Sequence, residues 1–294
     1  MIKRIIKQLI KPITRLLRRL LNSDANTNDT AIVAINQILE RLKQIEQRTY
    51  DYDMQILNNI KLFWKKIQPH DVIGTNKIRI GNNKDGGYII LQDLNSIDGV
   101  ISIGVGSDNS SDVYLARQKI KVYAFDHTIN RLPRNHKNIV FFPIGVGNCK
   151  PTKPLSELIH QVAGLKSNQL MLMMDVEGAE YEAILDCPTE ILSQFKQIVI
   201  EFHGLSMVLN SSRTNDFFSV MDKMSFTHHV VHVHANNISP CLTIGAFQMP
   251  FVMEITFARS TDYCFKPYHG TLPTTIDKPN CSVREDYKFD VYSG

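Results

Sequence analysis

Short apolar runs alternate with helical or polar segments over most of this chain, and this alternation limits the folds open to it. Five runs follow one another between residues 99 and 201, and two more follow a predicted helix near 214–224. Continuous apolar strands that alternate with helices form a mostly parallel sheet with both faces covered. The predicted strands lie at 99–103, 121–125, 139–142, 170–174, 197–201, 228–233 and 251–257. The sequence therefore predicts an α/β domain with a mostly parallel seven-stranded sheet, in which ligands bind beyond the carboxyl ends of the strands.

The composition is that of a globular protein, with 43% hydrophobic and 21% charged residues among 294. Every apolar stretch is far shorter than the roughly 20 residues that a membrane-spanning helix needs. The five cysteines form no C-x-x-C pair, which argues against a disulfide framework or a structural zinc site. Composition therefore favours a reducing, cytoplasmic compartment.

The formal net charge of +4 is distributed unevenly. Residues 1–22 contain seven Lys and Arg and no acid, a charge of +7, which leaves −3 for the rest. On a helix, these cations fall on one face and the Ile and Leu side chains on the other. Such a helix can bind an anionic membrane surface, so we expect a peripheral position at the inner face of the membrane. The alternatives are packing against protein, an organelle transit peptide and a nucleic-acid arm.

Residues 23–62 are predicted to form a polar linker and a helical stalk. From Ala31 to Ile56 the apolar positions alternate steps of four and three, the spacing of a coiled coil. Such a stalk would join copies of the chain into a homo-oligomer, whereas the alternative is an ordinary helix packed on the domain. A further helix is predicted over 53–68. Residues 63–294 then form one catalytic domain with a C-terminal arm.

The first two predicted strands end in residues typical of a cofactor site. Gly104 and Gly106 follow the first strand in the sequence Gly-Val-Gly-Ser-Asp, and their lack of a side chain lets the backbone approach a ligand. The second strand ends in Asp126, whose carboxylate is placed to accept hydrogen bonds from ribose hydroxyls. Asn109 stands where a nicotinamide-binding loop would have its third glycine, which disfavours a dinucleotide.

Acids and histidines follow the later strands. Asp175 and Glu177 come directly after the fourth strand, and Glu180 is expected to begin a helix, where negative charge is favoured. Glu201 and His203 end the fifth strand on one side of it. Beyond the sixth strand stand three polar side chains that we expect to bind substrate, His234, Asn236 and Asn237.

These residues predict two kinds of chemistry. His203 is the best general base by its ordinary pKa, near 6.5, and Asp175 and Glu177 are the competing candidates. Asp175 with Glu201, His203 or His234 could instead hold a divalent cation such as Mg²⁺ or Mn²⁺ with oxygen and nitrogen ligands.

Six segments occur together in an order that resembles a known family. They are Gly81-x-x-x-Asp-Gly-Gly-Tyr88, the 104–108 turn, Phe125-Asp-His-Thr128, Asp175-Val-Glu-Gly-Ala-Glu180, Ile200-Glu-Phe-His203 and His234-Ala-Asn-Asn237. Over about residues 76–260 the chain resembles FkbM-type methyltransferases, S-adenosylmethionine-dependent enzymes with a Rossmann-like class I fold. Two residues depart from the pattern of such enzymes. Ser102 stands where an acid is common, and His127 follows Asp126 where many relatives have Glu-Pro.

The resemblance implies positions for the cofactor. Gly104 and Gly106 would border its methionine part and Asp126 its ribose. The residues implied near its amino acid end are Asp85, Gly87 and Asp108, and those near its adenine are Ile144 and Gly145. The family often methylates sugar hydroxyls, so we expect an O-methyltransferase acting on a glycan or glycan precursor. A nicotinamide-dependent sugar-modifying oxidoreductase and a non-catalytic, membrane-recruited scaffold remain alternatives. A nucleic-acid substrate is disfavoured, because the chain after residue 22 has a net negative charge and no run of basic residues interspersed with aromatic ones.

The basic segment 1–22, called the leader from here on, gives a direct test of membrane binding. We expect the full chain to float with anionic vesicles, and deletion of residues 1–22 to abolish this, because the leader contains the basic apolar helix. A full chain that does not bind such vesicles would contradict the prediction.

Overall fold

The computed structural model describes residues 10–19, 29–162, 168–209, 214–244 and 246–290. The chain divides into two compact units, Met1–Lys61 and Leu62–Gly294. Residues 10–19 are helical, and the remainder of the predicted 1–22 helix lies outside the described residues. Among the residues described, no helix combines the length and the apolar character needed to cross a bilayer.

A single helix, α2 (Asp29–Lys66), replaces the two segments predicted for the stalk and for 53–68. No glycine or proline occurs within it, so nothing in the sequence removes a backbone donor or favours a break. Its last turn belongs to the second unit, where the Trp64 indole N–H donates to the Gln248 carbonyl at 2.9 Å and Phe63 packs on Phe217. The end of α2 is therefore anchored in the core of that unit.

The seven-stranded sheet of the second unit has the order β11-β14-β10-β9-β4-β5-β6. Its strands are β4 (Gly99–Ile103), β5 (Lys121–Phe125), β6 (Ile139–Phe142), β9 (Leu170–Met174), β10 (Phe195–Phe202), β11 (His228–Ala235) and β14 (Met253–Arg259). The five from β6 to β10 are parallel, whereas β14 runs antiparallel between β10 and β11. The predicted fold class is confirmed: this is a mixed α/β fold with a mostly parallel seven-stranded central sheet, preceded by N-terminal helices, and it is consistent with a Rossmann-like methyltransferase fold.

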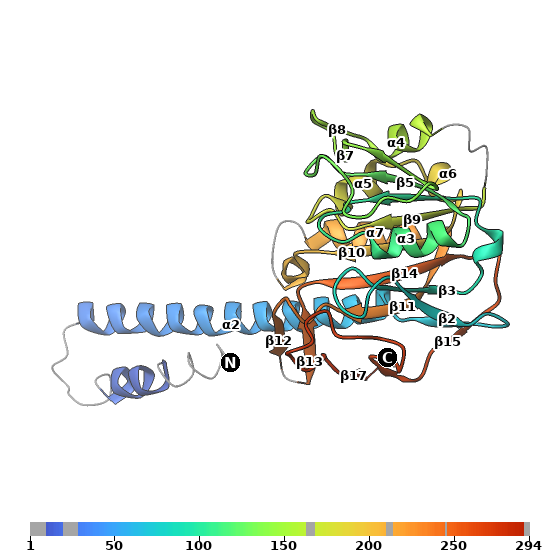
Figure 1. The fold of residues 1–294 in the computed structure, drawn as a ribbon. Helices are drawn as coiled ribbons and strands as arrows, with labels where there is room; N and C mark the ends of the chain where they lie inside the picture. The colour runs from blue at the N-terminus through green and yellow to red at the C-terminus, as the bar shows by residue number, and fades with distance from the viewer. Residues whose placement is uncertain (1–9, 20–28, 163–167, 210–213, 245, 291–294) are drawn as a thin grey trace. The chain divides into compact units, whose positions relative to one another are not determined.

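Helices and a hairpin cover the two faces of the sheet (Figure 1). The helices are α3 (Ser110–Arg117), α4 (Leu155–Gln161), α5 (Glu180–Asp186), α6 (Thr189–Leu192) and α7 (Thr214–Ser225), with 3₁₀ turns η1 (Leu94–Ser96) and η2 (Leu205–Val208). The hairpin of β2 (Lys77–Ile80) and β3 (Tyr88–Leu91) packs with α3 on Val100, Val122 and Met171. On β10, Val199 faces this side, whereas the alternate residue Phe202 contacts Tyr181 of α5 and Phe217 of α7. Alternation along the strands thus supplies an apolar core on both faces.

The C-terminal arm is ordered by short strand pairs. The remaining strands are β1 (His70–Val72), β7 (Gly145–Val146), β8 (Thr152–Lys153), β12 (Cys241–Ile244), β13 (Phe247–Pro250), β15 (Phe265–Pro267), β16 (Thr271–Leu272) and β17 (Phe289–Asp290). From the arm, β15 pairs with β1 near the start of the second unit, and within the arm β16 pairs with β17. The arm also sends polar side chains, among them Asp277 and Asn280, into buried positions.

Candidate functional site

A cavity of about 450 Å³ opens at the carboxyl ends of the central strands. From β4, the strand order continues through β5 and β6 in one direction and through β9 and β10 in the other. The strand order therefore reverses between β4 and β9, which is where open α/β sheets bind ligands. The loops after these two strands, 104–109 and 175–179, line the cavity together with the loop after β5.

The glycine turn after β4 is shaped by close backbone contacts. Gly104 has a φ of +81°, and a Cβ there would overlap the carbonyl oxygen of Asp175. Gly106 also has a positive φ, +55°, but open space lies around it. Of these two glycines, only Gly104 combines a positive φ with a lack of room for a Cβ.

Asp126 holds this turn through all of its usual acceptor positions. One carboxylate oxygen accepts the backbone N–H groups of Val105 and Gly106, each at 2.8 Å. The other accepts the N–H and the hydroxyl of Thr128, each at 2.7 Å. A carboxylate offers about four acceptor sites, so the chain's own donors occupy those of Asp126. Ribose binding by Asp126 stays a prediction, and a ligand hydroxyl would have to share or replace these contacts.

Most of the residues predicted to bind cofactor line the same cavity. These are Asp85, Gly104, Gly106, Asp108, Asp126 and Gly145. Gly87 is not among the lining residues, whereas its neighbour Gly86 is. A Cβ at Gly87 would overlap Asn82 and Arg79. Ile144 is likewise outside the lining.

The cavity lining is strongly acidic. Among the residues that the structure describes, no Lys or Arg lines the cavity. Six carboxylic acids do: Asp85, Asp108, Asp112, Asp126, Asp175 and Glu177. Burial raises the pKa of Asp112 to about 6, despite a hydrogen bond from Ser102 that lowers it. Burial also raises the pKa of Asp175. Such a wall favours a cationic or hydroxylated ligand over a phosphate.

His203 lies among four carboxylates. Its Nε2 is 3.4 Å from Glu177, 3.7 Å from Asp175 and 3.9 Å from Glu201, and its Nδ1 is 3.5 Å from Glu180. Glu180 begins α5 as predicted, but it is also fully buried and accepts the backbone N–H of His203 at 2.6 Å. The ring is thus held beside the acids that follow β9.

This environment changes the predicted role of His203. Burial lowers the pKa of its imidazole, but contacts with Glu180, Glu201 and Asp175 outweigh burial and raise that pKa above its ordinary value. The raised pKa favours the protonated ring, so the ordinary pKa of an imidazole is a poor guide to a base role for His203. Asp175, with its raised pKa, is the better proton acceptor.

Three of these residues could hold a cation together. Single ligand atoms of Asp175, Glu177 and His203 lie within 4.8 Å of one another. One carboxylate oxygen of Asp175 is buried without a hydrogen-bond partner among the described residues. Glu177 has a φ of +53°, a left-handed conformation that is strained for a residue with a side chain. Of the residues predicted as alternative ligands, Glu201 borders this group and His234 is not part of it.

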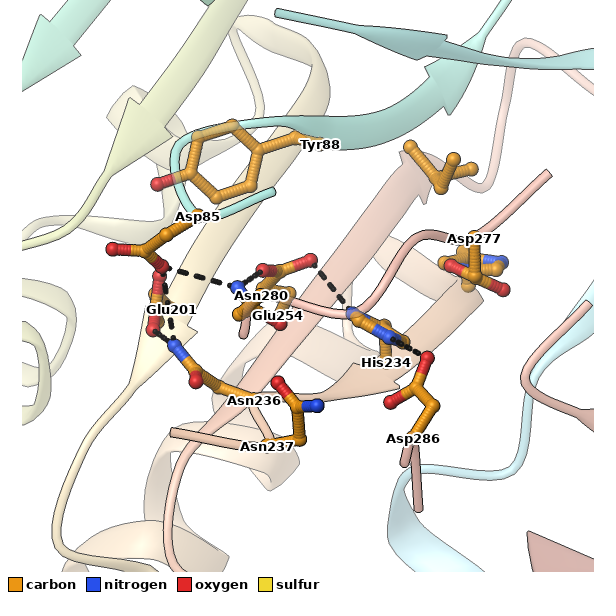
Figure 2. A network of polar contacts seen from close by, with 12 residues as sticks. Asp85, Tyr88, Glu201, His234, Asn236, Asn237, Glu254, Asp277, Asn280 and Asp286 are labelled. Atoms are coloured by element: carbon orange, nitrogen blue, oxygen red, sulfur yellow. Dashed lines mark hydrogen bonds and ion pairs between the residues drawn. The ribbon is translucent and has the colours of Figure 1, made fainter. Parts of the chain in front are cut away.

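A mostly buried polar network links Asp85 of the cavity wall to Glu201 of β10, Glu254 of β14 and His234 of the edge strand β11 (Figure 2). The Asn236 amide donates to Glu201 at 2.8 Å and to Asp85, a cavity residue, at 3.3 Å. Asn280 of the C-terminal arm donates to the same Asp85 oxygen at 3.1 Å. Burial raises the pKa of Glu201, and nearby Glu254 and Asp175 raise it further. Two amides thus orient an acid of the cavity wall.

His234 is the cation of this network. Its ring nitrogens contact Glu254 at 3.3 Å and Asp286 at 3.0 Å, and Glu254 also accepts from Asn280 at 2.7 Å. Burial lowers its pKa, but the hydrogen bonds to Asp286 and Glu254 raise it to about 10.

The three residues predicted to bind substrate are therefore bonded to the protein itself. Asn237 donates to backbone carbonyls of the arm, the nearest being Cys281 at 3.0 Å. None of the three lines the cavity. Substrate binding by them stays a prediction.

Several residues of the site were not predicted. Tyr88, which lies in the quoted Asp-Gly-Gly-Tyr segment, lines the cavity, and its hydroxyl is 3.4 Å from Asp175. Asp112 stands in the first turn of α3, four residues after Asp108 of the glycine turn, a position that could have indicated it. Asn280 and Asp286 had no such signal, because they stand in an arm without a periodic pattern.

The charge of His234 predicts how stability depends on pH. A folded-state pKa raised above the ordinary 6.5 stabilises the fold fully below pH 6.5, and this is lost as pH rises towards 10. We expect the free energy of unfolding to fall less between pH 6 and 9.5 in His234→Gln than in the parent protein. Denaturant titrations at both values measure this.

His269→Gln is the control for this experiment, because His269 is exposed. It should keep the pH dependence of the parent protein. Equal pH dependence in His234→Gln and the parent would contradict a buried imidazolium.

No protein-family model matches the chain, and no curated protein matches it. Among solved structures, a fibrillarin/Nop5p complex is similar at 14% identity over 56% of this chain and 73% of the fibrillarin-complex chain, with a TM-score of 0.36. A Methanococcus jannaschii fibrillarin pre-rRNA processing protein is similar at 11% identity over 64% of this chain and 84% of its own, with a TM-score of 0.35. The fold class therefore rests on the strand order of the sheet and not on these similarities.

Proposed function

We propose that this protein is an S-adenosylmethionine-dependent O-methyltransferase that acts on a sugar hydroxyl of a glycan or glycan precursor. One observation carries the proposal: the cavity at the strand-order reversal has six acids and no Lys or Arg in its described lining. A sulfonium cation is stabilised by such a wall, whereas the pyrophosphate of a nicotinamide dinucleotide is repelled. The resemblance to FkbM-type enzymes supports the same cofactor.

The residues of the cavity fit that cofactor. The turn at Gly104 and Gly106 leaves room for a ligand close to the backbone, and Asp85 and Asp108 offer carboxylates for the ammonium group of its amino acid end. When bound, S-adenosylmethionine supplies an activated methyl group. The protein's task is then to align an acceptor oxygen and to remove its proton, with reacting atoms roughly 3–3.5 Å apart.

Asp175 is the proposed proton acceptor. Its side chain lines the cavity beside the turn, and its raised pKa matches a base that works near neutral pH. His203 stabilises the carboxylate from 3.7 Å, and Tyr181 helps to hold His203 by donating to its carbonyl at 2.7 Å. The sugar hydroxyl itself is proposed from the family resemblance.

Ligand binding tests the proposal. Calorimetry should detect binding of S-adenosylmethionine and S-adenosylhomocysteine but not of NAD. Gly106→Leu should weaken binding at least about 100-fold, roughly 2.7 kcal/mol, because the new side chain enters the cavity. Methyl incorporation from labelled cofactor into surface glycans or sugar nucleotides then identifies the acceptor.

Gly74→Leu is the matched control. Gly74 also has a positive φ, +84°, with open space around it, but it lies outside the cavity lining. It carries a similar backbone cost and should bind normally. Binding of NAD alone would favour the oxidoreductase, and binding of none of the three ligands would favour the scaffold.

We also propose an alternative state of the site, in which a divalent cation, Mg²⁺ or Mn²⁺, binds to Asp175, Glu177 and His203. Cation binding would displace the proton of His203 and occupy the carboxylate of Asp175, so Asp175 would not be the proton acceptor in this state. Mn²⁺ is expected to raise the melting temperature by about 2–4 °C, the shift that about 1 kcal/mol gives a domain of this size. Glu177→Gln should remove the shift, and the exposed control Glu190→Gln should keep it. Metal-free protein with full methyltransferase activity and no Mn²⁺ shift would contradict the site.

A further inference from the structure

Helix α2 exposes a line of apolar side chains along most of its length. Ile38, Ile45 and Tyr52, each seven residues apart, are 45%, 48% and 38% exposed. Together with the intervening positions they form the α2 seam, defined as residues 35, 38, 42, 45, 49, 52 and 56. Exposed apolar residues at this spacing mark a surface that binds another helix.

The opposite face of α2 is mostly polar and makes contacts within the helix, although Val33, Tyr50 and Met54 are exposed apolar residues there. Lys43 pairs with Glu40 at 3.2 Å, and Gln47 donates to Asp51 at 2.8 Å. Helices gain most of their stability in proteins from packing an apolar face, and long isolated helices are marginal in water. The α2 seam is therefore the face through which this helix gains stability.

We propose that the α2 seam binds the same seam of a second copy of this chain, in a parallel, in-register coiled coil. With Ile35 and Ile38 as the first a and d positions, Arg41 and Arg48 occupy g and Glu46 and Asp53 occupy e. In a parallel coiled coil each g residue faces the e residue of the next heptad on the other copy.

Charges flanking the α2 seam match this arrangement. Arg41 of one copy faces Glu46 of the other, and Arg48 of one copy faces Asp53 of the other, so four opposite-charge pairs form around a two-fold axis. In an antiparallel pairing, Arg would face Arg and acid would face acid, which is repulsive. The charge pattern thus selects both a second copy and its direction.

The charge pattern also disfavours the chain's own leader as the occupant. Residues 10–19 are helical and apolar on one side, but they carry four cations and no acid. A cationic helix packed on the α2 seam could pair with Glu46 and Asp53, but it would meet Arg41 and Arg48 with charge of the same sign. A second copy instead offers both signs in register.

Sedimentation of the full chain over a wide concentration range tests the proposal. The parent protein should have the mass of an oligomer, and Ile38→Asn with Ile45→Asn should weaken association at least about 100-fold, since polar groups are then buried in every copy. The matched control is Val33→Asn with Met54→Asn. These two residues are also exposed and apolar, at 55% and 38%, but lie on the outer face, and the control should associate normally. Both variants should keep the melting temperature of the second unit.

A cross-link tests the direction. Ile38→Cys should give a disulfide-linked dimer above the level of the parent chain, because parallel pairing places residue 38 beside its own copy. Val33→Cys, on the outer face, should not. Absence of the Ile38→Cys cross-link in a chain that still associates would overturn the parallel arrangement.

Two results overturn self-association itself. One is a full chain that stays monomeric over the whole range. The other is a chain that associates only after residues 1–22 are deleted, since the leader then covers the α2 seam.

Discussion

The backbone contact between the turn after β4 and the end of β9 is the constraint on which the candidate site depends. These strands are neighbours in the sheet, and the N–H of Asp175 donates to the carbonyl of Ile103 at 2.9 Å. Gly104 has no side chain, so the two loops can lie against each other, and Asp126 holds the turn from β5. The cavity exists because these strand ends are held together without side chains between them.

Buried acidity is the second property of the site. Carboxylates gather around the cavity and along β10 and β14, where burial alone would make their charges costly. Amides from Asn236 and Asn280 donate to these carboxylates. The pKa values of His203 and His234 are raised, which favours the protonated, positively charged form of each ring. Protons and hydrogen bonds, rather than Lys or Arg side chains, balance the described cavity wall. The proposed cationic cofactor would complete this balance.

The chain separates its properties along its length. The first unit contains the basic leader and most of α2, with an exposed apolar seam and matched flanking charges. The second unit contains the acidic cavity and a core on both faces of its sheet. Self-association through α2 and methyl transfer in the cavity therefore use different residues, and either proposal can fail without the other.

Features that follow from local pattern could be predicted from the order of the amino acids. The strands β4, β5, β6 and β9 begin and end where their apolar runs do, and the glycine turn and the acids after β9 stand at the strand ends where a ligand site forms. These features are periodic or lie next to one another in the chain, so the sequence is enough to reveal them. Three other features depend on how the chain folds. Asp126 uses its oxygens on the glycine turn, His203 lies among four carboxylates, and Asn280 donates to Asp85. Asn280 and Asp85 are 195 residues apart. Contacts between such distant residues leave no local pattern, and the pKa of a buried group depends on the neighbours that folding brings to it.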